Sequence, residues 1–162
     1  RSFGNVVDVN KSNDLEKRLT KIVVKEGEER KEAIIESIPL DGSSSDNVSL
    51  SSQYMQKFIA QVSVGELDVL VLDKGKFESL VKQDIFLKLD NRNQLDLASI
   101  KNEKIEAKGR DNNMAVYAIN VENNKIFKDM GYDTKNKVIA IVSTSKQKEN
   151  STLVLKWLLN IK

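Results

Sequence analysis

The sequence predicts one α/β domain in three layers, with helices on both faces of a mainly parallel central sheet. Short apolar runs of strand length alternate along the chain with segments of helical periodicity, which is the order of strands and crossover helices in a parallel sheet. Two of these runs, residues 69–72 and 138–142, are almost wholly apolar. A strand that offers no polar side chain to either face is predicted to lie inside the sheet.

The first half of the chain contains two predicted strands and two predicted helices. Residues 6–9 form a β-rich run, and Asn13 then caps a helix that ends at Gly27. Residues 33–40 are predicted as a second strand, because a proline and a serine-rich turn end an apolar run there. Residues 51–65 form the clearest helix, with apolar side chains every three or four positions.

The second half continues the alternation. Residues 91–113 are mostly polar and weakly periodic, so they are predicted to be a connection with one short helical turn. The other predicted elements are a strand at 69–72, a helix containing Phe77 and Leu80, a strand at 85–89, a strand at 114–121, a helix at 126–130, a strand at 138–142 and a helix at 153–161.

Composition limits the chemistry that is open to the chain. Its 162 residues, 40% of them hydrophobic, suffice for one core, so we expect a single domain over residues 1–162. The 26 Lys and Arg residues nearly balance the 24 Asp and Glu residues, and no nucleic-acid partner is expected. Cys and His are absent, which excludes disulfides, Cys/His zinc sites and imidazole bases. We therefore expect no enzymatic activity, metal or cofactor.

One short motif leaves a catalytic interpretation open. Ser143 and Lys146 match the S-x-x-K of serine hydrolases that use a lysine base, and residues 45–47 have the form S-D-N. The two elements stand in the wrong order for that class, and no K-T-G follows them. Because Ser and Thr are also ordinary helix caps, a strand-to-helix loop is the preferred interpretation. A Ser/Lys hydrolase is kept as a remote alternative.

The candidate ligand-binding residues follow the predicted strands. In open parallel sheets, sites form outside the carboxyl ends of the strands, where helix N-termini and loop side chains meet. The residues at these positions are Asn10, Ser12, Asn13, Asp73, Lys74, Ser143 and Ser145. We expect them to converge on one rim of the sheet and to bind a ligand there. The competing interpretation is that they only cap helices.

Three segments resemble bacterial solute-binding proteins of the type 2 periplasmic-binding fold. In residues 53–73 a helix, a Gly-x-x-Asp turn that starts at Gly65 and a strand follow one another as in that family. Residues 77–90, which close on Phe-Leu-Lys-Leu-Asp, resemble its next segment. Residues 138–161, an apolar strand followed by a serine- and asparagine-bearing loop and an apolar helix, are similar to its terminal part. The chain has room for one lobe of such a protein rather than two.

The resemblance implies a non-enzymatic, extracytoplasmic binding or interaction domain derived from one solute-binding lobe. Such a shortened form is similar to uncharacterised membrane-anchored proteins of Gram-positive bacteria. We therefore expect an anchor that precedes Arg1, outside this sequence, and a position on the outer face of the cell membrane. The expected partner is a small solute or a cell-envelope protein. A small cytoplasmic α/β regulatory or ligand-binding domain is the alternative that the residues leave open.

Overall fold

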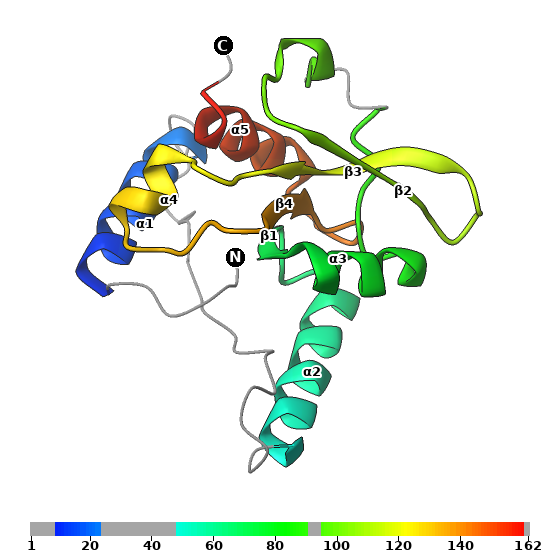
Figure 1. Ribbon diagram of the computed structural model, residues 1–162. Coiled ribbons are helices and arrows are strands. Elements are labelled where there is room, and N and C mark those ends of the chain that lie inside the picture. The colour runs from blue at the N-terminus through cyan, green and yellow to red at the C-terminus, as the bar shows by residue number, and fades with distance from the viewer. Residues whose placement is uncertain (1–8, 24–47, 91–94, 161–162) are drawn as a thin grey trace.

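The computed structural model describes residues 9–23, 48–90 and 95–160. Within these ranges, the chain forms a small sheet with helices packed on both of its faces (Figure 1). In chain order the elements are α1 (Val9–Val23), α2 (Val48–Ser63), β1 (Val69–Asp73), α3 (Lys74–Leu80), the 3-10 helices Val81–Gln83 and Leu97–Ser99, β2 (Lys104–Lys108), β3 (Met114–Asn120), α4 (Lys125–Asp129), β4 (Lys137–Ile141) and α5 (Lys148–Leu158).

The four described strands form one sheet in the order β1-β4-β3-β2, and every neighbouring pair is antiparallel. The predicted mainly parallel three-layer α/β sheet is therefore wrong. Apolar runs report burial on both faces of a strand and carry no information about strand direction, because helices can cover both faces of an antiparallel sheet too. In addition, β2 lies inside residues 91–113, so a β-hairpin stands where a connection was predicted.

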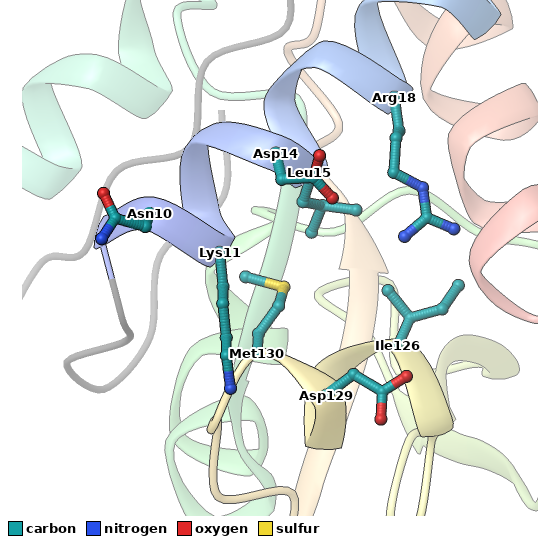
Figure 2. Close-up of a pocket in the computed structure, with 8 residues that line it drawn as sticks. All are labelled: Asn10, Lys11, Asp14, Leu15, Arg18, Ile126, Asp129 and Met130. Atoms are coloured by element: carbon teal, nitrogen blue, oxygen red, sulfur yellow. The ribbon is translucent and has the colours of Figure 1, made fainter.

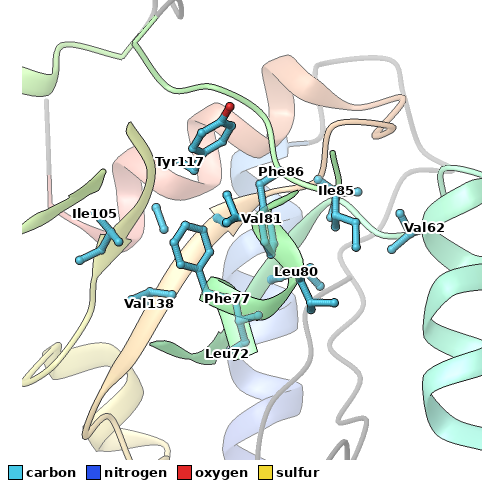
Figure 3. Close-up of a cluster of buried hydrophobic side chains, with 14 of the residues drawn as sticks. Val62, Leu72, Phe77, Leu80, Val81, Ile85, Phe86, Ile105, Tyr117 and Val138 are labelled. Carbon is cyan, nitrogen blue, oxygen red and sulfur yellow. The ribbon is translucent and has the colours of Figure 1, made fainter. Parts of the chain in front are cut away.

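Side chains alternate between two hydrophobic clusters on opposite faces of the sheet. Leu70 and Leu72 of β1 belong to a cluster that also holds buried residues of α2 and α3, Phe58 and Phe77 among them (Figure 3). Val69 and Val71, one position out of step, belong to a second cluster with buried residues of α1, α4 and α5. This alternation is the period of two that an extended strand imposes. The helices α1, α4 and α5 therefore share one face of the sheet.

The position of β1 in the sheet differs from the prediction. β4 is an inner strand, as predicted, but β1 lies at the edge of the described sheet. Its apolar residues are nevertheless at most 7% exposed. Burial of the predicted core residues Phe58, Leu70 and Ile139 is confirmed, whereas Trp157 on α5 is only half-buried.

The segment at residues 85–89 is a bridge between strands rather than a strand. Phe86 forms an isolated antiparallel bridge with Val142, and the Leu87 amide donates to the carbonyl of Ile141. The Leu89 amide donates to the carbonyl of Val116 on β3. The segment thus links the end of β4 to β3, and it does not complete a parallel βα unit.

The predicted strand at 33–40 and most of the predicted strand at 6–9 lie outside the described residues, and Val9 is the first residue of α1. Among the described helices, none combines the length and the apolar character needed to span a bilayer.

Candidate functional site

The predicted site residues of the first loop lie in a helix. α1 begins at Val9, so Asn10, Ser12 and Asn13 occupy its first turns instead of a loop after a strand. The side chains of Asn10 and Asn13 are exposed, and that of Ser12 lies outside the described part of the chain.

Asp73 and Lys74 lie where β1 passes into α3. The carboxylate of Asp73 pairs with the ammonium group of Lys137, which is almost fully buried on β4. Asp73 precedes α3 without capping it through its side chain. The Lys74 amide donates to the carbonyl of Asn136 at 2.8 Å. These contacts join the end of β1 to the start of β4, and the charge of Asp73 is balanced by that of Lys137.

Ser143 and Ser145 lie in the loop after β4, and their hydroxyls bind other parts of the fold. The Ser143 hydroxyl donates to the carbonyl of Asp84 at 2.6 Å. The Ser145 hydroxyl donates to Asp68 Oδ1 at 2.6 Å and accepts from the Gln147 amide at 3.0 Å. Ser145 is 3% exposed. These contacts tie the loop to the segments before β1 and after α3.

The structure does not bring these predicted residues together on one rim. In the antiparallel pair of β1 and β4, Val69 lies opposite Ile141 and Asp73 lies opposite Lys137. The loop with Ser143 therefore adjoins the start of β1, while Asp73 lies at its end. Four residues of extended chain separate the two ends by about 14 Å. The prediction of a shared rim assumed parallel strands, whose carboxyl ends lie at one edge of the sheet. In an antiparallel pair, the carboxyl ends of the two strands lie at opposite edges.

A cavity of about 280 Å³ lies between α1 and α4 (Figure 2). We call it the α1/α4 cavity. Its lining residues are Asn10, Lys11, Asp14, Leu15, Arg18, Ile126, Asp129 and Met130. Of the predicted site residues, Asn10 alone is among them. The cavity lies on the face of the sheet that α1, α4 and α5 cover, and it is open to solvent on one side.

Packing of α1 positions one wall of the cavity. Leu15 and Leu19 are buried in the cluster beneath the helix, which fixes the rotation of α1 on the sheet. One turn along, the guanidinium carbon of Arg18 lies 5.0 Å from the centre of the Trp157 ring on α5. A guanidinium stacked on an indole keeps N–H groups at its edge for other acceptors.

Asn124 positions the opposite wall. Its side-chain oxygen caps α4 by accepting from the amides of Ile126 at 3.0 Å and Phe127 at 3.3 Å. Its side-chain amide donates to the carbonyl of Leu158 at 2.8 Å, which ties α4 to the end of α5. Below the helix, Phe127 and Met130 are buried. The short helix α4 is therefore held at both its start and its buried side.

The rim of the α1/α4 cavity carries charges of both signs. Lys11, Asp14 and Arg18 come from α1, and Asp129 comes from α4. Within the described part of the chain, neither Asp14 nor Asp129 forms an ion pair. The floor is apolar, formed by Leu15, Ile126 and Met130. Two cations and two carboxylates around an apolar floor can orient a small charged molecule.

The sequence held a partial signal for this cavity. Lys11, Asp14 and Arg18 stand on the helical face beside Leu15, at spacings of three and four residues. The contribution of α4 was not predictable from spacing, because Ile126 and Asp129 follow α1 by more than a hundred residues.

The comparisons with known proteins identify no relative. No protein-family model, curated protein or solved structure matches this chain. In the described ranges, no group of three or more Asp and Glu side chains is placed to hold a metal ion.

Proposed function

We propose that this chain is a non-enzymatic binding domain and that its ligand site is the α1/α4 cavity. One observation carries the proposal: an apolar floor and charged groups of both signs converge from two helices on a cavity of about 280 Å³. Small-molecule sites combine a mainly apolar lining with a few polar groups that fix orientation. The carboxylates of Asp14 and Asp129 form no ion pair with the described residues, which supports a role for them in binding a ligand.

The size of the cavity limits the ligand. Sites for drug-sized molecules measure roughly 300 to 1,000 Å³, so this cavity of about 280 Å³ lies just below that range. A metabolite-sized solute fits, and a folded partner does not. Because one side of the cavity is open, we expect weak and reversible binding.

The surroundings of the S-x-x-K motif favour binding over hydrolysis. The Ser143 hydroxyl donates to a backbone carbonyl. The side chain of Lys146 runs along Gly65, where an added Cβ would lie 3.3 Å from the Lys146 Cε. A lysine base has to receive the proton of the serine nucleophile, and this serine directs its proton elsewhere.

We further propose that the domain works outside the cell membrane, as the resemblance of residues 53–73 to bacterial solute-binding proteins implies. An apolar segment encoded immediately upstream of Arg1 would support this placement. An uninterrupted soluble start would instead favour the cytoplasmic regulatory domain.

The binding function can be tested by methyl-resolved NMR with a small-molecule fragment library. We expect some fragments to shift the methyl signals of Leu15, Ile126 and Met130, and to leave Leu80 on the opposite face of the sheet unchanged. Ile126→Phe should fill the cavity and remove the shifts. Leu153→Phe, which enlarges an exposed side chain on α5, is the matched control. A library that shifts no cavity methyl, or shifts that survive Ile126→Phe, would refute the proposal.

A further inference from the structure

The charges at the α1/α4 cavity alternate in sign around its rim. Along α1, Asp14 stands between Lys11 and Arg18, and Asp129 faces them from α4. Figure 2 shows the side chains of Lys11 and Arg18 extending from α1 toward α4, with Ile126 and Asp129 on the facing helix. The wall formed by α1 therefore carries charges of both signs, and the wall formed by α4 carries a carboxylate.

This arrangement disfavours ligands that carry charge of one sign only. A carboxylate or phosphate that approaches Lys11 and Arg18 also comes close to the carboxylates of Asp14 and Asp129. An amine that approaches those carboxylates comes close to the two cations. A molecule with both charges can place each of them beside a rim group of opposite sign, which a ligand with charge of one sign cannot do.

We infer that the ligand of the α1/α4 cavity is a small zwitterion with an apolar body, of the size and chemistry of a free α-amino acid; this inference rests on the binding function proposed above. Its carboxylate pairs with Arg18, whose N–H groups form a planar fork suited to two carboxylate oxygens. Its ammonium group pairs with Asp129. Its aliphatic side chain lies on Ile126 and Met130.

Four probes separate the contributions of the two charges and the apolar body. L-leucine has all three, 4-methylpentanoate lacks the ammonium group, 3-methylbutylamine lacks the carboxylate, and glycine lacks the side chain. Titrations followed through the cavity methyls should give L-leucine a Kd lower by about tenfold or more than that of each other probe, because each probe removes one favourable contact. A Kd for 4-methylpentanoate or 3-methylbutylamine equal to that of L-leucine would overturn the inference.

Two substitutions assign the charges. Asp129→Asn should weaken L-leucine binding by about tenfold, and it should not weaken 4-methylpentanoate, because it removes a carboxylate that repels this probe. Arg18→Gln should weaken L-leucine to about the affinity of 3-methylbutylamine. Two controls remove a charge from an exposed position elsewhere: Glu78→Gln on α3 matches Asp129→Asn, and Arg110→Gln in the β2–β3 turn matches Arg18→Gln. Neither control should change the Kd of L-leucine. Losses of the same size in the controls would overturn the assignment.

The outcomes distinguish the two proposals. If L-leucine does not bind but another library fragment shifts the cavity methyls, the ligand class is wrong and the binding function stands. If no compound shifts them, both fail. The probe series uses the unsubstituted chain, so it decides the ligand class even if a substituted chain is unstable.

Discussion

The loop after β4 and the α1/α4 cavity are both rich in polar side chains, but they use them differently. In the loop, the hydroxyls of Ser143, Thr144 and Ser145 each donate to a group of another segment. At the cavity, the carboxylates of Asp14 and Asp129 form no ion pair with the described part of the chain. The loop matches a catalytic motif, and its hydroxyls bind other segments of the fold, whereas the cavity matches no motif and is the site that we propose for a ligand.

Substitutions in the loop after β4 and at the rim of the α1/α4 cavity should affect different properties of the protein. Removing a buried hydrogen-bonded group leaves its partner unsatisfied and costs free energy of unfolding. Removing an exposed, unpaired charge changes stability by at most about 0.5 kcal/mol. Substitutions in the loop should therefore lower stability, and substitutions at the cavity rim should affect ligand binding.

Gly65→Ala should have the largest effect on stability, because Gly65 lies at the contact between α2 and the loop. Its φ of +75° disfavours a side chain, and an added Cβ would lie 2.8 Å from the carbonyl oxygen of Thr144. We expect the free energy of unfolding in urea to fall by about 2 to 3 kcal/mol.

Gly131→Ala is the matched control for this prediction. Gly131 has a φ of +74°, but nothing lies within 4 Å of an added Cβ. It should cost only the backbone strain of about 1 to 2 kcal/mol. Equal losses at the two glycines would show that the loop does not press against the end of α2.

Ser145→Ala should lower the free energy of unfolding by about 1 to 2 kcal/mol, because it removes a buried hydroxyl from between Asp68 and the Gln147 amide. Thermal denaturation compared with Ser79→Ala checks this. The hydroxyl of Ser79 is exposed and bonds only within its own helix, so its loss should cost less than about 0.5 kcal/mol. Indistinguishable melting temperatures for the two variants would count against a structural role of the loop.

The smallest effect is expected at an exposed ion pair, where charges are paired but solvated. Lys88 Nζ lies 2.6 Å from Asp111 Oδ2, and this hydrogen bond, with a second from the Asn113 amide, lowers the pKa of the Asp111 carboxyl. Because the folded pKa lies below the unfolded one, the stabilisation is present above the unfolded pKa and is lost as the pH falls through the folded pKa.

Lys88→Gln should therefore raise the pKa of Asp111 toward its ordinary value, as measured by carboxyl NMR titration, while stability at neutral pH changes little. Lys101→Gln, an exposed lysine beyond this pair, is the control. A pKa of Asp111 that stays low in Lys88→Gln would assign the shift to the backbone amide.

Several helices and strands were predictable from the sequence, and the tertiary arrangement was not. The helix α2 and the strand β4 lie close to the positions that the apolar pattern predicted. A helix places residues three and four apart on one face, and a strand places residues two apart on one face, so both patterns can be recognised within a short stretch of sequence. Strand direction depends on pairs of residues that are distant in the sequence. The strand β2 was missed because it lies at a sheet edge and only one of its residues, Ile105, is buried, so it forms no apolar run. Among the predicted site residues, Asn10 lines the α1/α4 cavity, whose facing wall lies far along the chain.

The most direct test of the account is to compare Ser145→Ala and Asp129→Asn in stability and in L-leucine binding, with Tm and cavity methyl shifts measured on the same samples. The account predicts that Ser145→Ala lowers the Tm and leaves the Kd unchanged, and that Asp129→Asn raises the Kd by about tenfold and leaves the Tm unchanged. Loss of binding in Ser145→Ala, with binding intact in Asp129→Asn, would contradict it and return the site to the loop after β4.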